Sequence, residues 1–308
     1  MSSAAAISGP RLADRAPPHA YFLVSAVFHY LGPAFAVMLF AAIEPLGVAW
    51  LRIASAALVF AIWRRPWRTW RGLTAPERWT IAGLGVALAA MNSLFYLAIH
   101  QLPLGTVGAI EFLGPIGLAA LGARSARNLA ALVVAVAGVA ILTDVRLEGA
   151  PLGYVYAFAN CALFVVYIVL GHRISGRGGL DRLALSMLVA MVVAFPLGIG
   201  EAAPAFLDVR LLAAGVGVGV SSSVIPYVAD QLAMARLPRA SFALLLSILP
   251  ATAVAIGFLV LRQVPTAAEL IGVGLVVIGV ALHRAREAGG GNAPGGRDEP
   301  NLRSRECE

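Results

Sequence analysis

Two matching sequence patterns, one in each half of the chain, limit the fold more than any other feature. Leu97-Ala98, Leu102-Pro103 and Pro115 recur at a constant offset of 135 residues. The recurring set is Leu232-Ala233, Leu237-Pro238 and Pro250, and the pairs Ala120/Ala255 and Gly122/Gly257 extend the match. The chain is therefore predicted to contain an internal duplication.

The composition places both copies in a membrane. Hydrophobic residues make up 60% of the 308 residues, charged residues only 13%, and the mean hydropathy is +0.84. So little polar surface indicates a polytopic membrane protein. The apolar stretches lie near 20–40, 46–63, 79–100, 104–121, 128–143, 150–171, 183–200, 209–232, 239–260 and 266–283. Several approach the ~20 residues that cross a ~30 Å hydrocarbon layer, whereas 128–143 needs help from flanking residues or local thinning.

Each copy holds five apolar segments, so the second copy is predicted to enter the bilayer upside down relative to the first. The predicted fold class is an all-α membrane protein with ten transmembrane helices arranged as two inverted five-helix repeats, as in many carriers. The predicted parts are an N-terminal arm (1–19), the first repeat (20–143), an external connector (144–149), the second repeat (150–284) and a disordered tail (285–308).

The arginines predict the orientation. All 23 basic residues are Arg, and 19 of them fall on the side of the predicted bilayer that holds the N-terminus. Only Arg146, Arg210 and Arg262 fall on the opposite side, and Arg52 lies within the second segment. This asymmetry predicts that both termini are cytoplasmic. The net charge of +7 therefore reflects orientation in a plasma membrane, and no nucleic-acid partner is expected.

Small residues at helical spacing predict close packing between helices, because bilayers supply no hydrophobic force between them. Gly83 with Ala87, and Gly215 with Gly219, have this spacing. The run from Gly215 to Gly219 resembles a phosphate-binding loop only superficially, since no strand or polar helix start accompanies it.

Three ionisable residues lie inside apolar stretches, namely Arg52, Glu111 and Asp230. A charge at mid-bilayer costs at least ~2.5–3.5 kcal/mol on insertion scales, so such residues face an interior or a watery cavity. They indicate either a substrate or coupling-ion site, or a structural ion pair between Arg52 and Glu111. For Asp230, solvation near a membrane boundary is a further alternative.

The repeat offset adds two polar pairs. Asn92 corresponds to Tyr227 and Tyr96 to Gln231, and the two members on each helix are four residues apart. Residues at this spacing share one helix face, so the two stripes are predicted to converge on one cavity. Tyr96 as a packing residue is the alternative.

The remaining polar and special residues carry weaker predictions. His29 and His100 are interpreted as interfacial histidines. Pro115 and Pro250 predict paired helix kinks beside the pathway, with simple helix geometry as the alternative. Cys161 and Cys307 do not predict a disulfide or metal site, and no cofactor is expected.

The segment from Met91 to Pro115, MNSLFYLAIHQLPLGTVGAIEFLGP, resembles the threonine/homoserine exporter branch of the drug/metabolite transporter superfamily, the EamA-type carriers. The segment Gly47-Val-Ala-Trp-Leu-Arg52-Ile-Ala and the segments around Pro238 and Pro250 fit the same pattern. The resemblance covers about residues 20 to 284. It implies ten helices in two repeats and export of small amino acids or related metabolites by alternating access, driven by the proton gradient.

This chain departs from the family pattern at several charged positions. Leu249 stands where the exporters have an acid, Arg262-Gln263 stands for Gly-Glu, and Val37 stands for a Lys. Recognition of a zwitterion by those charges is therefore not carried over.

The sequence predicts a secondary active exporter of threonine- or homoserine-like amino acids in the bacterial plasma membrane, acting as a monomer or homodimer. Glu111 is the predicted proton- or ammonium-sensing carboxylate, and Arg52 is its partner or the anchor for a carboxylate. The alternatives are a broader drug or nucleotide-type exporter, a non-transporting scaffold, or an intramembrane enzyme. No His-Glu-x-x-His, Gly-x-Ser-x-Gly or Cys/His metal spacing supports the enzyme.

Overall fold

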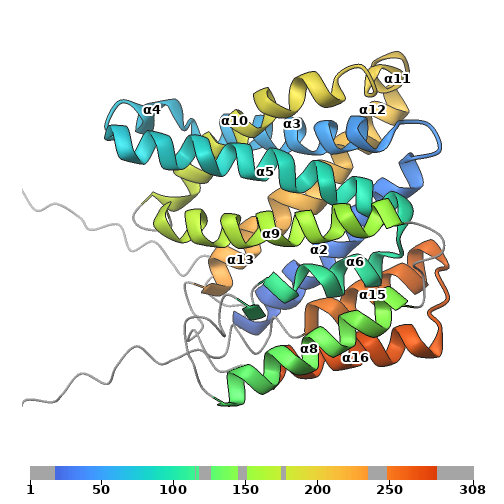
Figure 1. Ribbon diagram of the computed structural model, residues 1–308. Helices are drawn as coiled ribbons and strands as arrows, with labels where there is room; N and C mark the ends of the chain where they lie inside the picture. The colour runs from blue at the N-terminus through green and yellow to red at the C-terminus, as the bar shows by residue number, and fades with distance from the viewer. Residues whose placement is uncertain are drawn as a thin grey trace, which may run out of the picture.

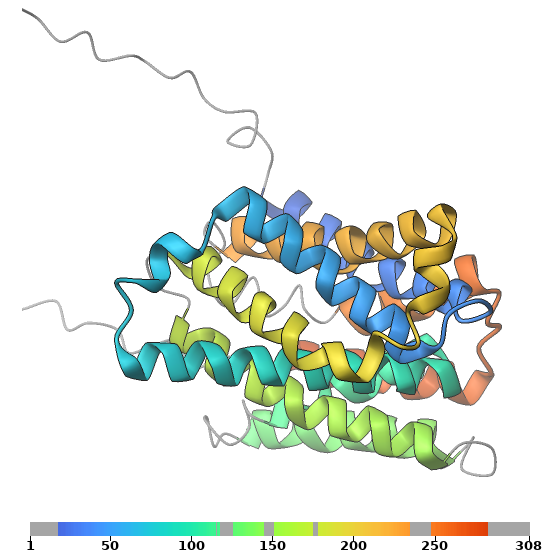
Figure 2. The ribbon, with the colours of Figure 1, turned by 90° about the horizontal axis from the view of Figure 1, so that it is seen from above.

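The computed structural model describes residues 18–114, 116–117, 126–144, 151–174, 178–234 and 248–282. These residues form helices and loops and contain no strand, so the predicted all-α class is confirmed. Figures 1 and 2 show a bundle of long helices, in which α2 and the segment from α12 to α13 run obliquely to helices such as α5 and α9. Successive long helices cross the molecule in alternating directions (Figure 1).

The helices of the first half are α2 (Pro18–Leu39), α3 (Pro45–Arg64), α4 (Trp67–Trp70), α5 (Ala75–Gln101), α6 (Leu104–Glu111) and α8 (Ala126–Asp144). The second half has α9 (Pro151–Ile174), α10 (Gly179–Gly198), α11 (Ala203–Leu207), α12 (Val209–Gly219), the π-helical turn η1 (Val220–Val224), α13 (Ile225–Met234), α15 (Ile248–Leu261) and α16 (Ala267–Leu282).

Within the described residues, a helix occupies part or all of every predicted apolar stretch. The short helices α4 and α11 and the π turn were not predicted. The eighth stretch, predicted as one helix, is divided into α12, η1 and α13. The connector (144–149) and the tail (285–308) lie outside the described residues, apart from Asp144, the last residue of α8.

Five helical segments of the described chain are long and apolar enough to cross a membrane. They are Pro45–Arg64, Ala75–Gln101, Pro151–Gly171, Gly179–Gly198 and Val209–Ala229. Shorter apolar helices cover Leu23–Leu39, Ala126–Leu142, Leu249–Leu261 and Ala267–Leu282. Large apolar side chains such as Ile62, Val192 and Leu259 point outward, with exposed fractions of 76%, 67% and 66%. An apolar exterior on apolar helices is what a lipid environment requires.

Local sequence explains where α5 and α16 begin. Thr74 precedes α5, and its backbone N–H donates to Glu77 Oε2 over 2.9 Å. Thr266 precedes α16 in the same way and donates to Glu269 Oε2 over 2.8 Å. In both cases a Thr and the Glu three residues later form a capping box, which satisfies donors at the helix start.

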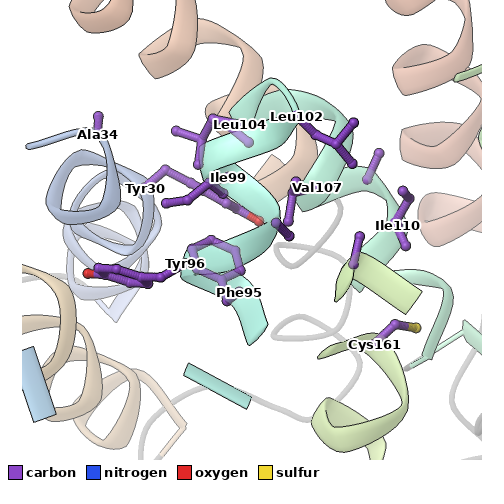
Figure 3. Packing of buried hydrophobic residues seen from close by; sticks show 14 of the residues in the cluster. Tyr30, Ala34, Phe95, Tyr96, Ile99, Leu102, Leu104, Val107, Ile110 and Cys161 are labelled. Carbon is purple, nitrogen blue, oxygen red and sulfur yellow. The ribbon is translucent and has the colours of Figure 1, made fainter. Parts of the chain in front are cut away.

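The packing of the helices follows a paired pattern. Helix α5 packs along α9 and α10, and α2 packs along α12, η1 and α13. Helix α3 packs on α10, α8 on α16, and α6 on α15. Figure 3 shows part of the resulting core, in which Tyr30, Tyr96, Leu104 and Ile110 are fully buried.

Glycines allow the close approaches, though not all at the predicted positions. A Cβ added at Gly215 would lie 2.9 Å from Leu51 Cδ1, which supports the close approach predicted there. A Cβ at Gly83 would meet only Leu170 Cδ1 at 3.6 Å, an ordinary contact, so the close packing predicted there is wrong. The close approach on α5 is at Gly85, where a Cβ would lie 2.7 Å from the Ser186 carbonyl oxygen of α10. The period of small residues was correct, but the register was two residues away.

Candidate functional site

A cavity lies among the helices and offers about 100 Å³ to the centres of water molecules. At roughly 10–15 Å³ for each water, this space is enough for several waters or one small polar molecule. Its wall is built from α2, α3, α5, α6, α9, α13 and α15 and from Phe112, which follows α6. The residues are Ser25, His29, Pro33, Arg52, Met91, Asn92, Phe95, Glu111, Phe112, Asn160, Phe164, Tyr167, Tyr227 and Leu249.

Arg52 is buried and is held by the π-helical turn of the neighbouring segment. Its Nε donates to Ser223 Oγ over 3.0 Å, and its Nη2 donates to the Ser222 carbonyl oxygen over 3.1 Å. A π-helical turn loosens the regular backbone ladder, and such turns are frequent at functional sites. The turn thus supplies a carbonyl acceptor for a buried guanidinium.

Tyr96 lies behind Arg52. The guanidinium carbon is 5.4 Å from the centroid of the Tyr96 ring, a cation–π distance. Tyr96 is fully buried and is not among the residues of the cavity wall, whereas its neighbour Phe95 is. Figure 3 shows the two rings pointing in different directions from α5. The structure therefore places Tyr96 as a support for Arg52.

Glu111 is buried at the C-terminal end of α6. Its Oε1 accepts a hydrogen bond from Asn160 Nδ2 of α9 over 3.1 Å, and its Oε2 has no hydrogen-bond partner. Glu111 and Arg52 line the same cavity, but the salt bridges of the described residues do not include a pair between them, and each binds neutral groups instead. The alternative of a structural ion pair between them is therefore wrong.

The two predicted stripes are only partly described. Asn92 and Tyr227 both line the cavity. Asn92 Nδ2 donates to the Leu88 carbonyl oxygen over 2.7 Å, which leaves its amide oxygen and its second N–H for a ligand. Asp230 and Gln231 belong to α13, but their side chains lie outside the described residues.

The prolines predicted to kink helices are also only partly described. Pro115 lies outside the described residues. Pro250 is buried near the described start of α15, beside the cavity residue Leu249. Both kinks stay predictions.

Besides Tyr167, three polar residues of the wall were not selected from the sequence. Ser25 and Asn160 are 135 positions apart, so the repeat offset could have indicated them as a pair. His29, interpreted as interfacial, lines the cavity and packs edge-on to Tyr30 with ring centroids 5.2 Å apart. The signal for all three was a polar side chain in an apolar stretch. Among the described residues, no cluster of three His, Cys, Asp or Glu side chains could hold a metal ion.

A multi-pass helical membrane protein with a buried, charged cavity among its helices has the construction expected of a small-molecule transporter. Residues 151–284 match the family model described as the EamA-like transporter family. The threonine/homoserine exporter RhtA of Escherichia coli K12 is 30% identical over 249 residues, covering 80% of this chain and 84% of its own. The RhtA of Salmonella typhimurium SL1344 is 32% identical over 247 residues, covering 78% and 82%.

The chain therefore belongs to the EamA-type carriers of the drug/metabolite transporter superfamily, in the branch of the threonine/homoserine exporters. A crystal structure of a protein whose description states no function is similar in fold. Its TM-score is 0.58 at 18% identity, covering 86% of this chain and 96% of its own. At that identity the likeness concerns the fold alone.

Proposed function

We propose that the protein exports small amino acids such as threonine and homoserine across the bacterial inner membrane by alternating access. The observation that carries this proposal is a cavity whose described wall holds both a buried cation, Arg52, and a buried carboxylate, Glu111. Two opposite charges that are not paired with each other match the carboxylate and ammonium of a zwitterion. The names of the RhtA relatives support the same substrate class.

In the proposed mechanism, Arg52 anchors the substrate carboxylate and Glu111 binds the ammonium. Arg52 has five N–H donors, of which the π turn uses two, so donors remain for a ligand. Asn92 and Tyr227 orient the substrate. Asp230 and Gln231 stay predicted substrate or coupling residues of the second repeat, and Tyr96 supports Arg52 through its ring.

Glu111 also provides a simple route to proton coupling. A carboxylate can hold a proton or pair with an ammonium, but protonation removes the charge that attracts the ammonium. A proton arriving from outside would thus release the substrate there, and loss of the proton inside would allow the next one to bind. This cycle is a proton/amino-acid exchange.

We propose that the architecture beneath this cycle is two inverted five-helix repeats. The helix pairs support it, because the packing of α2 on α12, η1 and α13 corresponds to the packing of α9 on α5. The positions 25 and 160, and 92 and 227, are each 135 apart and line the same cavity. The arginine distribution supports cytoplasmic termini.

Transport by the full-length protein in proteoliposomes tests this function. We expect uptake of labelled threonine or homoserine into these proteoliposomes when a pH gradient is imposed. Glu111→Gln should abolish it while elution from a sizing column and helix content stay normal. The matched control is Glu44→Gln, an exposed carboxylate before α3 that makes no side-chain capping bond. Unfolding of Glu111→Gln, or normal flux through it, would contradict the assigned role.

A broader drug or metabolite exporter is the second candidate. The aromatic part of the wall, formed by Phe95, Phe112, Phe164 and Tyr167, favours a more apolar substrate. The acid expected at the position of Leu249 is also missing. Extrusion of a hydrophobic toxic compound, with no flux of any labelled amino acid, would favour this candidate.

A further inference from the structure

Two buried acceptors without hydrogen-bond partners lie on side chains that touch each other in the cavity wall. Glu111 Oε2 and Asn160 Oδ1 both have no partner, while the other ends of the same groups are joined by the 3.1 Å bond from Asn160 Nδ2 to Glu111 Oε1. The exposed fractions of the two residues are 5% and 0%. Buried acceptors left without donors are costly, so two together indicate a donor that arrives with a ligand.

The ligand group can be specified from this geometry. It must bring at least two N–H or O–H donors, because two acceptors are available, and a positive charge, because one acceptor belongs to a carboxylate. Arg52 does not fill this role, since neither Glu111 Oε2 nor Asn160 Oδ1 accepts a hydrogen bond from it. A primary ammonium has three N–H donors and one positive charge.

The neighbouring wall is suited to the same cation. Phe112 follows Glu111 directly and lies edge-on to Phe164, with ring centroids 6.4 Å apart. Phe164 stacks on Tyr167 with centroids 5.8 Å apart and an interplanar angle of 11°. Aromatic faces attract cations and offer no competing hydrogen bonds. They can therefore cover the side of an ammonium that does not donate to the two oxygens.

We propose that Glu111 and Asn160 together form a subsite for a primary ammonium, with Asn160 as a specificity-determining residue. The subsite deepens the proposed function and rests on it for the role of the cavity. It accepts primary amines whether or not they carry a carboxylate. It rejects N-acylated compounds, which have lost the charge and keep one N–H.

Three related compounds test this subsite by calorimetry on the purified full-length protein. Threonine has both charges, threoninol has only the ammonium, and N-acetylthreonine has only the carboxylate. We expect threonine and threoninol to bind and N-acetylthreonine to bind at least tenfold more weakly. Equal binding of N-acetylthreonine, or no binding of threoninol, would overturn the subsite.

Variants of Asn160 give the second arm of the test. Asn160→Leu keeps the size and removes both polar ends, and Asn160→Ala guards against misfolding from poor fit. Each should weaken threonine and threoninol at least tenfold. Asn128→Leu, which alters a buried asparagine of α8 outside the cavity wall, should leave both affinities unchanged. Wild-type affinity in a folded Asn160 variant would overturn the proposal. If neither variant folds, the binding of threonine, threoninol and N-acetylthreonine to the wild-type protein decides the proposal.

The outcomes separate the subsite from the proposed function. If threoninol binds in an Asn160-dependent way but no amino acid is transported, the subsite stands and the exporter proposal fails. If threonine is transported, but its affinity is unchanged in the Asn160 variants and N-acetylthreonine binds equally well, the exporter proposal stands and the subsite fails.

Discussion

At the residue scale, the site depends on how each buried charge is satisfied. Arg52 and Glu111 each bind neutral groups from helices far away in sequence, Ser223 at 171 positions and Asn160 at 49. Neutral partners hold the side chains in place without cancelling their charges. A cavity with two such charges can exchange one set of contacts for another when a ligand enters, which an ion pair between them would resist.

Replacing Arg52 should lower stability as well as transport. Arg52→Ala leaves the Ser222 carbonyl without its donor, a loss of about 1–3 kcal/mol. The stability of Arg52→Lys should lie between those of the wild type and Arg52→Ala, because an ammonium lacks the planar fork that reaches both acceptors. Thermal unfolding in detergent measures the difference. Arg173→Ala, an exposed arginine of α9, serves as control, and a fully stable Arg52→Ala would refute the structural part of the argument.

Arg262 occupies a backbone conformation that suits glycine. Its φ is 58°, in the left-handed region, where a side chain costs about 1–2 kcal/mol. The resemblance to the exporters implies Gly at this position, and Arg in its place has a conformational cost. Arg262→Gly should raise the free energy of unfolding by up to about 1 kcal/mol after the entropy cost of glycine. Arg173→Gly, inside α9, should lower the free energy of unfolding. A change of the same sign in both variants would contradict a conformational cost at Arg262.

At the element scale, the segment α12–η1–α13 is interrupted by a π turn, and this turn holds Arg52. Gly219 ends α12 where this segment meets α3, and the π turn follows at once. Three serines occupy the turn, and Ser221 Oγ bonds back to the Gly217 carbonyl oxygen over 2.8 Å. Serines that bond to the backbone in this way bend helices and compete with the regular ladder. The turn can therefore present its carbonyl to Arg52.

The crossing at Gly219 predicts a sharp contrast between two glycines. A Cβ at Gly219 would lie 2.7 Å from the Arg52 carbonyl oxygen and would also meet Ser55 Oγ. Gly219→Ala should therefore push α12 from α3, costing about 1–3 kcal/mol, and weaken transport. Gly217→Ala meets nothing within 4 Å and should be neutral or slightly stabilising. Thermal unfolding and transport flux are measured for both variants. Equal stability and equal flux of the two variants would contradict the close crossing at Gly219.

At the scale of the whole molecule, α6 and α15 cross next to the cavity. A Cβ at Gly105 would lie 3.5 Å from Val254 Cβ, and Gln263 Oε1 accepts a hydrogen bond from the Leu104 N–H over 3.1 Å. Both contacts lie at the start of α6, the end of that helix for which the arginine distribution predicts the outside. Under the proposed alternating access, we expect these two helices to separate there in another state.

A disulfide across this crossing should stop transport. The Cβ separation lies within the ~3.5–4.5 Å of natural disulfides. In a background with Cys161→Ser and Cys307→Ser, the pair Gly105→Cys and Val254→Cys should lose flux on oxidation and regain it on reduction. Each single cysteine variant serves as control. Full flux through the cross-linked protein would show that the two helices need not part.

The repeat and the apolar stretches allowed the helices to be predicted without any structure. Hydropathy over about 20 residues is a property of a continuous segment, so the all-α class and most helix positions followed from residue types alone. Arg52 and Glu111 could be selected in the same way, because a charge in an apolar stretch is rare whatever its neighbours are.

Only the tertiary structure decided which groups meet. Glu111 accepts a hydrogen bond from Asn160, and Arg52 donates to the π turn. Tyr96 contacts Arg52 through its ring and is not part of the described cavity wall. The close approach at Gly85 instead of Gly83 was decided in the same way. Such contacts depend on the rotation and offset of helices against each other. These are set by side-chain packing between segments far apart in the chain, which no local pattern records.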